Sequence, residues 1–571
     1  MKKILRYIAN FKKLTVIAVI LGIINVVSTL LVPVLIGKSV DGIIGMNDVD
    51  FGVALHYAVL MGITVLIAAL SSYFMTFFAA KISYSVAYSM RKDFEEKLNR
   101  LPLSYLDSVS KGDLLARMGI DTDTVSDGLL QTLVTFMTGA LTIFGTIIIM
   151  LVLNFQLALT VILITPLSLL TAALITGRSK KAFAEQAKKR GEISGHTEEY
   201  IRNQKIVKAF SYETYSEEIF GNLNGEMYKA GFTAQFYTAA VNPVTRFVNG
   251  LVYTFTGVVG MISILSGGGV TVGLLATFLS YANQYTKPFN EITAVVAELR
   301  NAISSADRVF KIIDETDEPD SGENTLYIEK GGLSASNVEF SYGESKALLR
   351  GINFSVYDGM KTAIVGTTGC GKTTLINLLM RFYDAKSGVI SADNIDIQTV
   401  TRSSLRRNFG MVLQDTFIFE GTIRDNISYG SDVTDEIIKT AAKSAGLHGF
   451  IKRLPDGYDT VVTSESGILS EGIKQLICIA RVMVKNTTDN PAQFLILDEA
   501  TSSIDTLTEQ KVSAAFLALM EGRTSFIIAH RLSTIKNADL ILVMDKGIIA
   551  EQGTHEELLS KRGLYYSMYN S

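Results

Sequence analysis

The chain has 571 residues, 48% of them hydrophobic, and a mean hydropathy of +0.28. This length exceeds a single domain, and the composition is too apolar for a purely soluble enzyme of this size, so part of the chain must lie in a membrane. The formal net charge of −3 argues neither for nor against nucleic acid as a partner. Because the only cysteines are Cys370 and Cys478, a disulfide framework or a four-thiolate metal site within one chain is excluded.

Six long apolar stretches account for the hydrophobic excess, and all of them lie in the first half of the chain. They run at roughly 14–37, 56–80, 129–153, 157–177, 233–265 and 270–293. About 20 helical residues cross a hydrocarbon core of about 30 Å, and a helix satisfies its own backbone polar groups there. We therefore expect six transmembrane helices, with both chain termini on the same side of the membrane.

Lysine and arginine cluster before the first stretch and after the second and fourth. These residues are Lys2, Lys3, Arg6, Lys12, Lys13, Arg91, Lys92, Lys97, Arg100, Lys111, Arg117, Arg178, Lys180, Lys181, Lys188, Lys189, Arg190, Arg202, Lys205 and Lys208. The connections on the opposite side hold only Lys38. Since cytoplasmic loops carry an excess of positive charge, we expect both termini and both long connections in the cytoplasm. The first apolar run is longer than a signal-peptide core, so its helix should be retained.

The second half of the chain has the pattern of an α/β domain. An acidic, turn-prone segment at 314–322 follows the sixth stretch and predicts a linker. From about residue 325, short β-branched runs such as 361–365 and 494–498 alternate with helical segments. This alternation is typical of a parallel sheet flanked by helices. We therefore predict an α-helical membrane domain over residues 1–320 and an α/β domain over residues 321–571.

A phosphate-binding loop opens at the end of the first of these runs. The segment Gly366-Thr367-Thr368-Gly369-Cys370-Gly371-Lys372-Thr373-Thr374 fits the P-loop pattern, follows an apolar strand and opens a helical run. Its glycines let successive backbone N–H groups face the phosphates, at a helix N-terminus whose dipole favours anions. Lys372 should reach the β- and γ-phosphates of ATP, and the Thr373 hydroxyl should ligate Mg²⁺. The α/β domain is therefore predicted to be a P-loop domain that binds ATP and Mg²⁺.

Two carboxylates, Asp498 and Glu499, end the buried apolar run at 494–498. Ligands of parallel sheets bind at the carboxyl ends of the strands, so both side chains are candidates for the ATP site. Asp498 would hold Mg²⁺ through water, and Glu499 would polarise the attacking water as a general base. The alternative is a strand that ends in solvated acids without a catalytic role.

Taken together, these motifs resemble those of ATP-binding cassette (ABC) proteins. The run at 500–505 continues the family pattern after Glu499, which favours the catalytic interpretation of the two acids. By the same resemblance, His530 matches the switch histidine that contacts the γ-phosphate. Gln414 matches the Q-loop glutamine that touches Mg²⁺ and water, and Tyr342 matches the aromatic residue that stacks on adenine. The order and spacing of these residues along the chain strengthen each assignment.

Two cytoplasmic connections resemble the intracellular loops of ABC exporters. The first spans residues 105–117 and continues to Asp121 and Asp123, and the second spans residues 195–210. In that family, such loops end in short coupling helices that sit in grooves of the nucleotide-binding domains. The alternative, solvated amphipathic helices with no partner, is disfavoured by the ATPase motifs in the same chain.

The family's signature motif, LSGGQ, reads Leu469-Ser470-Glu471-Gly472-Ile473 in this chain. In the family it closes over the γ-phosphate held by the other subunit, so Ser470 and Gly472 are expected to contact ATP. Glu471, however, places a carboxylate near that anion; at ~4 Å the repulsion is roughly 1 to 4 kcal/mol for effective dielectric constants of 80 to 20. The change at Ile473 also removes an amide. We therefore favour a dimer with a non-identical subunit over a homodimer that tolerates the substitutions.

Over essentially the whole chain, the resemblance is to type-I ABC exporters, and it implies a half-transporter with one ATP-binding domain. The resemblance also implies ATP-driven, multidrug-type export across a bacterial cell membrane, and the few charges in the predicted spans suit amphipathic or lipid-like substrates. The expected partners are a second half-transporter with an intact signature, the lipid bilayer and the substrate. Two alternatives stay open: a homodimeric lipid flippase or peptide exporter, and an ATP-gated regulatory or channel-like protein. Glu499 and His530 argue against gating, since gating requires ATP binding but no hydrolytic residues.

Overall fold

The computed structural model describes residues 2–45, 48–320, 322–343, 347–463, 467–487, 491–498, 506–529 and 535–570. The chain forms two compact units. The first comprises Met1–Asn99 and Ser110–Glu315, and the second comprises Arg100–Val109 and Thr316–Ser571. The short segment Arg100–Val109 interrupts the first unit in the sequence but packs as part of the second.

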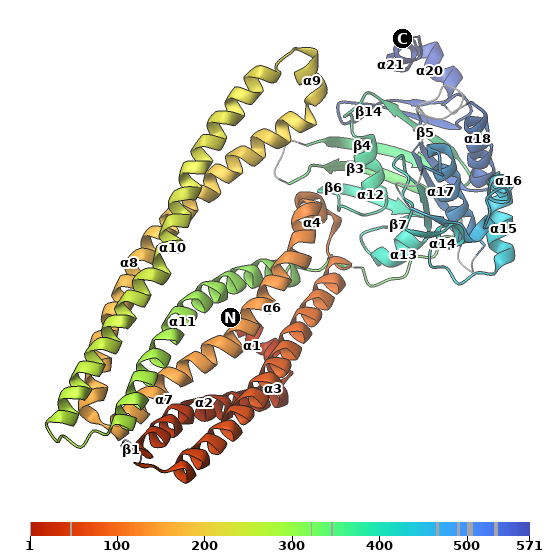
Figure 1. The fold of residues 1–571 in the computed structure, drawn as a ribbon. Helices are drawn as coiled ribbons and strands as arrows, with labels where there is room; N and C mark the ends of the chain where they lie inside the picture. Colours follow the sequence, from red (N-terminus) through yellow and green to blue (C-terminus); the bar gives the residue numbers. More distant parts are fainter. Residues whose placement is uncertain are drawn as a thin grey trace. The chain divides into compact units, whose positions relative to one another are not determined.

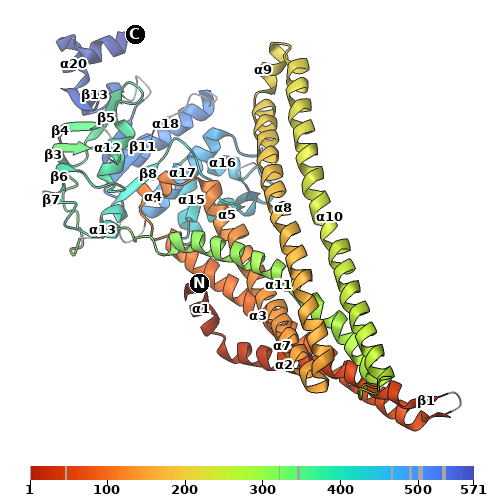
Figure 2. The same ribbon diagram turned by 90° about the vertical axis from the view of Figure 1, so that its left-hand side faces the viewer.

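The first unit is almost entirely helical. Its helices are α1 (Lys2–Ala9), α2 (Lys12–Asp41), α3 (Phe51–Leu98), α5 (Lys111–Ala116), α6 (Thr122–Gln131), α7 (Met137–Leu153), α8 (Phe155–Arg202), α9 (Gln204–Ala209), α10 (Glu213–Leu265) and α11 (Val272–Ile313). Two π-helical turns, η1 (Arg117–Asp121) and η2 (Thr132–Phe136), join α5, α6 and α7, and a small hairpin of β1 (Ile43–Gly45) and β2 (Asp48–Val49) joins α2 to α3. In both views α8 and α10 run side by side, with α9 at one end of the pair (Figures 1 and 2).

Long apolar helices confirm the helical character predicted for this half of the chain. Among the described residues, four helical stretches are long and apolar enough to cross a membrane. They are Lys12–Asp41, Phe51–Leu98, Lys111–Leu153 and Glu213–Leu265, and they cover the first, second, third and fifth predicted spans. The fourth and sixth predicted spans fall within α8 and α11, which have 48 and 42 residues. The count of six spans therefore stays a prediction.

Polar caps set where several of the long helices begin. Asp50 accepts a hydrogen bond from the Val53 N–H at the start of α3, Asn154 caps α8 and Thr271 caps α11 in the same way. Each cap satisfies a backbone donor that the first helical turn leaves open. These residues therefore fix the points at which the chain reverses between helices.

Buried side chains from several helices hold the first unit together. Leu30 of α2 and Phe278 of α11 belong to one buried apolar cluster, to which α7, α8 and α10 also contribute. The Tyr281 hydroxyl donates a hydrogen bond of 2.5 Å to the Leu30 carbonyl. Near the C-terminal end of α11, Arg308 forms an ion pair with the buried Asp121 of η1. The Arg308 Nε and the Asp121 Oδ2 are 2.8 Å apart. Apolar burial and a paired charge therefore both tie α11 to the helices that precede it.

The second unit contains two principal sheets with helices around them. Its elements are α4 (Leu103–Ser108), β3 (Leu333–Phe340), β4 (Leu349–Val356), β5 (Lys361–Gly366), α12 (Lys372–Leu379), β6 (Ser387–Ala392), β7 (Ile395–Asp396), α13 (Arg402–Arg407), β8 (Phe409–Val412), β9 (Gly421–Thr422), α14 (Ile423–Ser428), α15 (Asp435–Ser444), α16 (His448–Ile451), η3 (Gly457–Asp459), β10 (Val461–Val462), α17 (Glu471–Lys485), β11 (Phe494–Asp498), α18 (Thr506–Met520), β12 (Thr524–Ile528), β13 (Leu540–Asp545), β14 (Ile548–Gly553), α20 (His555–Lys561) and α21 (Leu564–Asn570). The six-stranded sheet has the order β14-β13-β5-β12-β11-β8 and is parallel except for β14. The other sheet is antiparallel, with the order β4-β3-β6-β7.

Alternate residues of the central strands point into two different cores. On β11, Leu495 and Leu497 belong to the core that packs against α15, α17 and α18. Their neighbours Phe494 and Ile496 belong to the core shared with α12 and the antiparallel sheet. A strand that is buried on both faces reads as a continuous apolar run, as the sequence of β11 does. The predicted parallel sheet flanked by helices is therefore confirmed.

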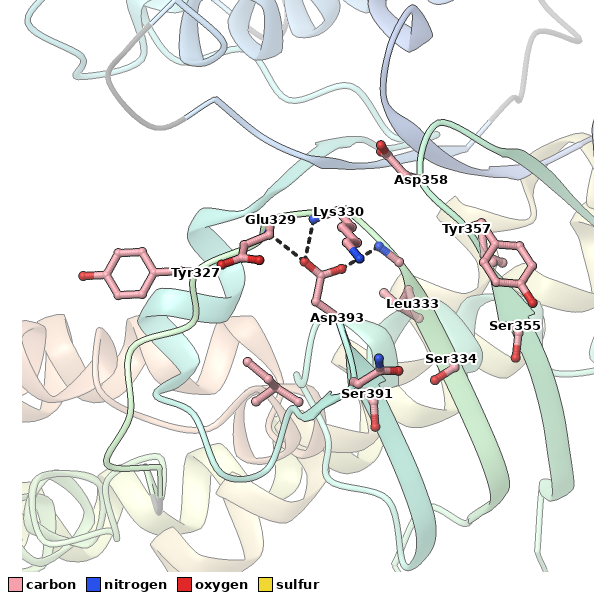
Figure 3. Close-up of a pocket in the computed structure, with 14 residues that line it drawn as sticks. Tyr327, Glu329, Lys330, Leu333, Ser334, Ser355, Tyr357, Asp358, Ser391 and Asp393 are labelled. Carbon is pink, nitrogen blue, oxygen red and sulfur yellow. Dashed lines mark hydrogen bonds between the residues drawn. The ribbon is translucent and has the colours of Figure 1, made fainter.

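A tight hairpin turn supports one end of the antiparallel sheet. Asp393 and Asn394 join β6 to β7 with φ values of 48° and 64°, and Ala392 pairs with Ile395. Two left-handed residues in a two-residue loop match the twist of the flanking strands. The Asp393 carboxylate accepts hydrogen bonds from the backbone N–H groups of Glu329, Lys330 and Gly332 (Figure 3). Asp393 thereby fixes the segment that enters β3, at the edge of a hollow of about 740 Å³.

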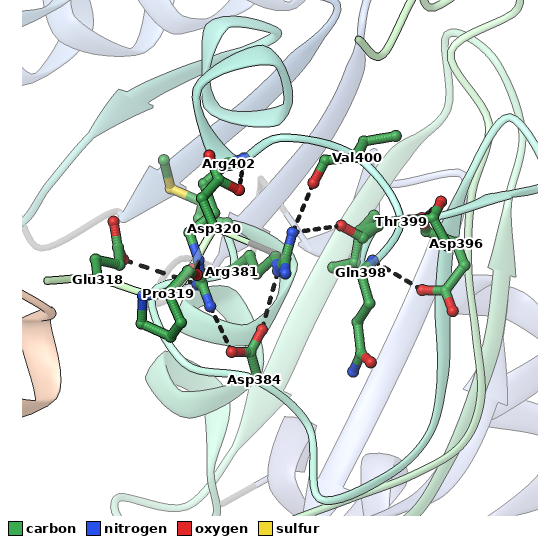
Figure 4. Close-up of polar contacts among 12 residues, drawn as sticks. Glu318, Pro319, Asp320, Arg381, Asp384, Asp396, Gln398, Thr399, Val400 and Arg402 are labelled. Atoms are coloured by element: carbon green, nitrogen blue, oxygen red, sulfur yellow. Dashed lines mark hydrogen bonds and ion pairs between the residues drawn. The ribbon is translucent and has the colours of Figure 1, made fainter. Parts of the chain in front are cut away.

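A network of arginines, two of them buried, holds the chain that enters the second unit. The Arg402 guanidinium donates to the Pro319 carbonyl at 2.8 Å, to the Arg381 carbonyl and to the Asp384 carboxylate (Figure 4). Arg381 donates to Asp384 and to two backbone carbonyls. Arg406 forms a bidentate pair with Glu318, with distances of 2.9 and 2.6 Å. These bonds satisfy charges that burial would otherwise penalise, and they attach residues 318 and 319 to α13, beside the turn that follows α12.

Candidate functional site

The carboxyl edge of the six-stranded sheet gathers the predicted site residues. The parallel strands β5, β12, β11 and β8 are neighbours in that order, so their carboxyl ends lie along one edge. The phosphate loop follows β5, Asp498 is the last residue of β11, and Gln414 lies two residues after β8. Open parallel sheets bind ligands at this edge. The topology thus brings together groups that are about 40 to 130 residues apart in the sequence.

Close packing at two positions of the phosphate loop requires glycine. A Cβ atom on Gly366 would lie 2.3 Å from the Met544 carbonyl oxygen and 2.7 Å from the Cys370 sulfur. A Cβ atom on Gly371, which caps α12 at φ 108°, would lie 2.6 Å from Leu349. The loop can therefore take this path only without side chains at these two residues, and the path leads its backbone to the N-terminus of α12.

Lys372 and the two threonines after it extend from the start of α12. The Lys372 ammonium donates to the carbonyls of Gly366 at 2.7 Å and Thr367 at 3.2 Å, so it is held over the loop. Thr373 is exposed, whereas Thr374 is buried and its hydroxyl lies 3.3 Å from that of Tyr342. The amine and the exposed hydroxyl are therefore both placed beside the loop where a phosphate would sit.

Tyr342 lies in a group of three aromatic rings. Its ring packs edge-to-face against Phe340 and Tyr383, with centroid distances of 4.9 and 5.0 Å, and 40% of the residue is exposed. A partly exposed ring held by two others offers a stable surface for stacking on adenine. The Tyr383 hydroxyl in turn donates to Asp107 of α4. Burial, followed by this hydrogen bond, raises the pKa of Tyr383 above its ordinary value.

Oxygen ligands suited to Mg²⁺ come from two strands. The exposed Thr373 hydroxyl follows β5, and the partly buried Asp498 carboxylate ends β11. Hydroxyl and carboxylate oxygens are the hard donors that Mg²⁺ prefers, and it usually keeps several waters and binds through one or two protein groups. The described residues contain no cluster of three or more His, Cys, Asp or Glu side chains. The donor set therefore fits Mg²⁺ held jointly with nucleotide phosphates better than a metal held by protein alone.

Some predicted residues lie outside the part of the chain that the structure describes. They include the proposed general base Glu499 and the proposed switch residue His530. Of their described neighbours, Asp498 ends β11 and Ala529 follows the adjacent strand β12. The assignments of Glu499 and His530 therefore stay predictions.

The altered signature motif lies at the start of α17. Ser470 caps this helix and accepts a hydrogen bond from the Ile473 N–H at 3.4 Å, and Gly472 is buried. The Glu471 carboxylate accepts hydrogen bonds from Lys474 at 2.8 Å and from the Thr416 hydroxyl at 3.1 Å. The bond from Lys474 lowers the pKa of Glu471, burial opposes this effect, and Thr416 adds to it. The extra carboxylate is thus ionised and paired within its own chain.

Sequence reasoning missed three residues near the site, namely Tyr383, Thr416 and Arg481. Tyr383 supports Tyr342, and Thr416 binds Glu471. Arg481 of α17 donates to the carbonyls of Phe417 and Asn426. An aromatic residue shortly after the P-loop helix was the only signal for Tyr383. Nothing in the sequence indicated which partners Thr416 and Arg481 would have, because these contacts join residues 55 to 64 positions apart.

The two predicted coupling regions contain short helices. In the first, α4 (Leu103–Ser108) belongs to the second unit, and α5 follows in the first unit. In the second, α9 (Gln204–Ala209) borders a hollow of about 540 Å³ with exposed apolar residues that include Ile206 and Phe210. A helix with an exposed apolar face is unusual in solution and typical of a docking element.

Comparisons with known proteins place both halves of the chain. The family model for the ABC transporter transmembrane region matches residues 15–289, and the model described as ABC transporter matches residues 349–502. A fatty acid ABC transporter ATP-binding/permease protein of Mycobacterium bovis is 42% identical over 481 residues, which is 84% of this chain and 75% of that protein. The putative multidrug export ATP-binding/permease protein YgaD of Bacillus subtilis is 33% identical over 581 residues, which is 100% of this chain and 98% of that protein. The solved structure of a bacterial Atm1-family ABC exporter with ATP bound has a TM-score of 0.79 at 29% identity and covers 98% of both chains.

Proposed function

Because the chain belongs to the ABC transporter family, we propose that it is a half-transporter that exports amphipathic small molecules together with a non-identical subunit. The chain is an ATPase coupled to transport, with a helical transmembrane region and a P-loop domain. One observation carries the ATP site: the phosphate loop, Asp498 and Gln414 meet at the carboxyl edge of one sheet. We place ATP at this edge, in contact with all three.

ATP binding is assigned to groups at both ends of the nucleotide. The ring of Tyr342, supported by Tyr383, would stack on adenine. The backbone N–H groups of residues 366–374 would surround the phosphates at the N-terminus of α12. Lys372, now bound to two loop carbonyls, would instead donate its N–H hydrogen bonds to phosphate oxygens, which carry negative charge and are stronger acceptors.

Hydrolysis is assigned to the residues after β11, β12 and β8. Glu499 would take a proton from water as its oxygen attacks the γ-phosphorus and the bond to the β–γ bridging oxygen breaks, releasing ADP and phosphate. Gln414 would orient the water and His530 would contact the γ-phosphate. Mg²⁺, when bound through Thr373 and Asp498, would offset the phosphate charge.

The altered signature supports a non-identical partner. In a symmetric dimer of this chain, Glu471 and Ile473 would stand in the signature at both ATP sites. Paired with an intact signature, this chain's own phosphate loop and Glu499 would form a competent site, and its altered signature would close only the weaker one. The homodimer stays the alternative.

Substrate class is inferred from the membrane half and from relatives. Few charges interrupt the apolar helices, which suits amphipathic or lipid-like molecules. The YgaD relative is named as a putative multidrug exporter, which supports export of drug-like molecules. The Mycobacterium relative is named as a fatty acid transporter, and this favours a second candidate, export or flipping of a lipid. Peptide export is the further alternative within the same class, and ATP-gated regulation lies outside it.

The test combines one variant with a transport assay. Glu499→Gln should abolish steady-state ATP hydrolysis and retain ATP binding, because the water loses its base while the phosphate loop is unchanged; positioned bases contribute about 10²–10⁴-fold. Glu436→Gln, in the first turn of α15, is the matched control and should keep full activity. ATP-driven uptake of amphipathic dyes into inverted vesicles should occur with the control and not with Glu499→Gln. Residual hydrolysis above about a tenth would contradict the role of Glu499, and ATP-dependent ion flux without uptake would favour gating.

A further inference from the structure

The loop that carries Gln414 has few internal bonds and is attached to α17. Residues 413–420 follow β8 without helix or strand, and most of them are exposed. Ile418 is the residue of this loop that enters the apolar core. A loop with little buried surface opens locally at low cost unless side chains from elsewhere restrain it. The position of Gln414 therefore depends on the contacts that neighbouring residues of the loop make.

One face of α17 supplies several of these contacts, besides the two hydrogen bonds of 2.9 Å by which Asn426 of α14 holds the Phe419 N–H and carbonyl. Glu471, Lys474, Cys478 and Arg481 are spaced by three, four and three residues, which places them on one side of a helix. Arg481 donates to the Phe417 carbonyl at 2.6 Å and to the Asn426 carbonyl at 2.5 Å. The Cys478 thiol lies beside the Phe417 N–H and 3.7 Å from the Arg481 guanidinium. The loop is thus fixed to the middle of α17 at Phe417.

A second attachment lies at the first turn of α17 and depends on the unusual residue of the signature. The Thr416 hydroxyl, one residue before Phe417 and two after Gln414, donates to Glu471 at 3.1 Å. Lys474, which is 15% exposed, donates to the other oxygen of the same carboxylate at 2.8 Å. A carboxylate that is itself held by an ammonium group is a strong and well-oriented acceptor. The glycine of the usual LSGGQ motif has no side chain and cannot form this attachment.

We propose that Glu471 is a positioning residue of the ATPase site, which binds Thr416 and thereby holds the loop of Gln414 against the signature helix. Glu471 therefore does more than add a negative charge to the signature, because it also holds the loop of Gln414 through Thr416. Under the proposed dimer, Gln414 serves the ATP held by this chain, whereas the signature faces the ATP held by the partner. The Thr416–Glu471 contact would then join the two composite sites within one chain, a consequence that rests on the proposed function.

Amide hydrogen exchange of the full chain in nanodiscs, without nucleotide, tests the contact directly. Thr416→Val and Glu471→Ala should each speed exchange of the amides at 415–419 by about three- to tenfold, the range expected for the loss of one ordinary, solvent-exposed hydrogen bond. Thr416→Ser keeps the hydroxyl and should restore the wild-type rate. Glu436→Ala removes an acid from the first turn of α15 and is the matched control. The double variant Thr416→Val/Glu471→Ala should exchange no faster than the faster single variant.

Unchanged exchange in both single variants, or independent effects that multiply in the double variant, would overturn the proposal. A functional readout separates positioning from charge repulsion, because Thr416→Val leaves the carboxylate in place. In the preparation that turns over, whether the single chain or the pair, Thr416→Val should lower kcat severalfold with KM for ATP changed by less than twofold. Thr416→Ser should retain kcat. An unchanged kcat in Thr416→Val would exclude a positioning role. The exchange rates do not depend on which subunit is the partner. The proposed heterodimer could therefore be refuted while the Thr416–Glu471 contact is supported, or the reverse.

Discussion

Removing Glu318 is expected to loosen the chain where it enters the second unit. Its carboxylate forms two bonds to Arg406, at 2.9 and 2.6 Å, and lies 3.7 Å from the guanidinium of Arg402. Arg402 is 5% exposed, so the loss of an opposing charge is poorly compensated by water. At an effective dielectric constant near 20, the attraction across that distance is about 4 kcal/mol. Asp384 stays beside Arg402 and reduces this loss.

Asp384 reduces the loss at Arg402, and the partly exposed Arg406 pair contributes about 1 kcal/mol or less. We therefore expect Glu318→Ala to lower the free energy of unfolding of the second unit by about 2–3 kcal/mol. For a unit of this size, that corresponds to a lower Tm by about 4–10 °C. The change in Tm can be measured by calorimetry of the full chain in nanodiscs. The unit that binds ATP is identified by the transition whose Tm rises when ATP is added.

Glu323→Ala is the matched control, because Glu323 is exposed and lies five residues away. Its transition should stay within about 1 °C of wild type, as expected for a surface substitution. If Glu318→Ala also shifts the transition by less than about 1 °C, the buried network is not what holds this segment.

Two further predictions concern the P-loop and the hairpin at Asp393. Alkylation of Cys370, buried against Gly366, should inhibit hydrolysis because the adduct fills space that phosphate needs; ATP should protect, and inhibition that persists in Cys370→Ser would exclude this route. Burial alone would raise the pKa of Asp393, but its backbone hydrogen bonds outweigh burial and lower it. The stabilisation by this carboxylate should therefore be complete above its ordinary pKa and decline as pH falls through the lower pKa of the folded state. In unfolding measurements, Asp393→Asn should be less stable than wild type at pH 7 and converge with it at low pH; a difference that is constant with pH would contradict this assignment.

Local sequence patterns were sufficient to predict the strands, the loop and the helix around the proposed ATP site. The glycines of the phosphate loop, the apolar runs of β5 and β11, and the acid at Asp498 are adjacent in the sequence to the elements that position them. A motif of this kind specifies strand, turn and helix together, so its context can be checked by periodicity. The same local signals predicted the parallel sheet and the family, and the strand order and the family match confirm both.

Side-chain partners could not be predicted, because they depend on how distant elements pack. The resemblance to the family signature predicts that Glu471 lies near a phosphate, but only the fold shows that Thr416, 55 residues away, binds it. In the same way, Tyr383 joins Tyr342 only once β3 and the segment after α12 are adjacent. Buried arginines such as Arg402 are exceptions to the rule that charged residues lie at the surface, and the acceptors of Arg402 come from two segments that are distant in the sequence.

The most direct test of the central claim compares ATP hydrolysis by the purified single chain with hydrolysis by the co-expressed pair in the same lipid. The account predicts poor turnover by the single chain, whose two sites would both contain Glu471 and Ile473, and substrate-stimulated turnover by the pair. Altering the signature serine of the partner should stop turnover, whereas altering Ser470 of this chain should affect only the weaker site. Robust, drug-stimulated hydrolysis by the wild-type chain alone would contradict the heterodimer and leave a homodimer that accepts a carboxylate in its signature.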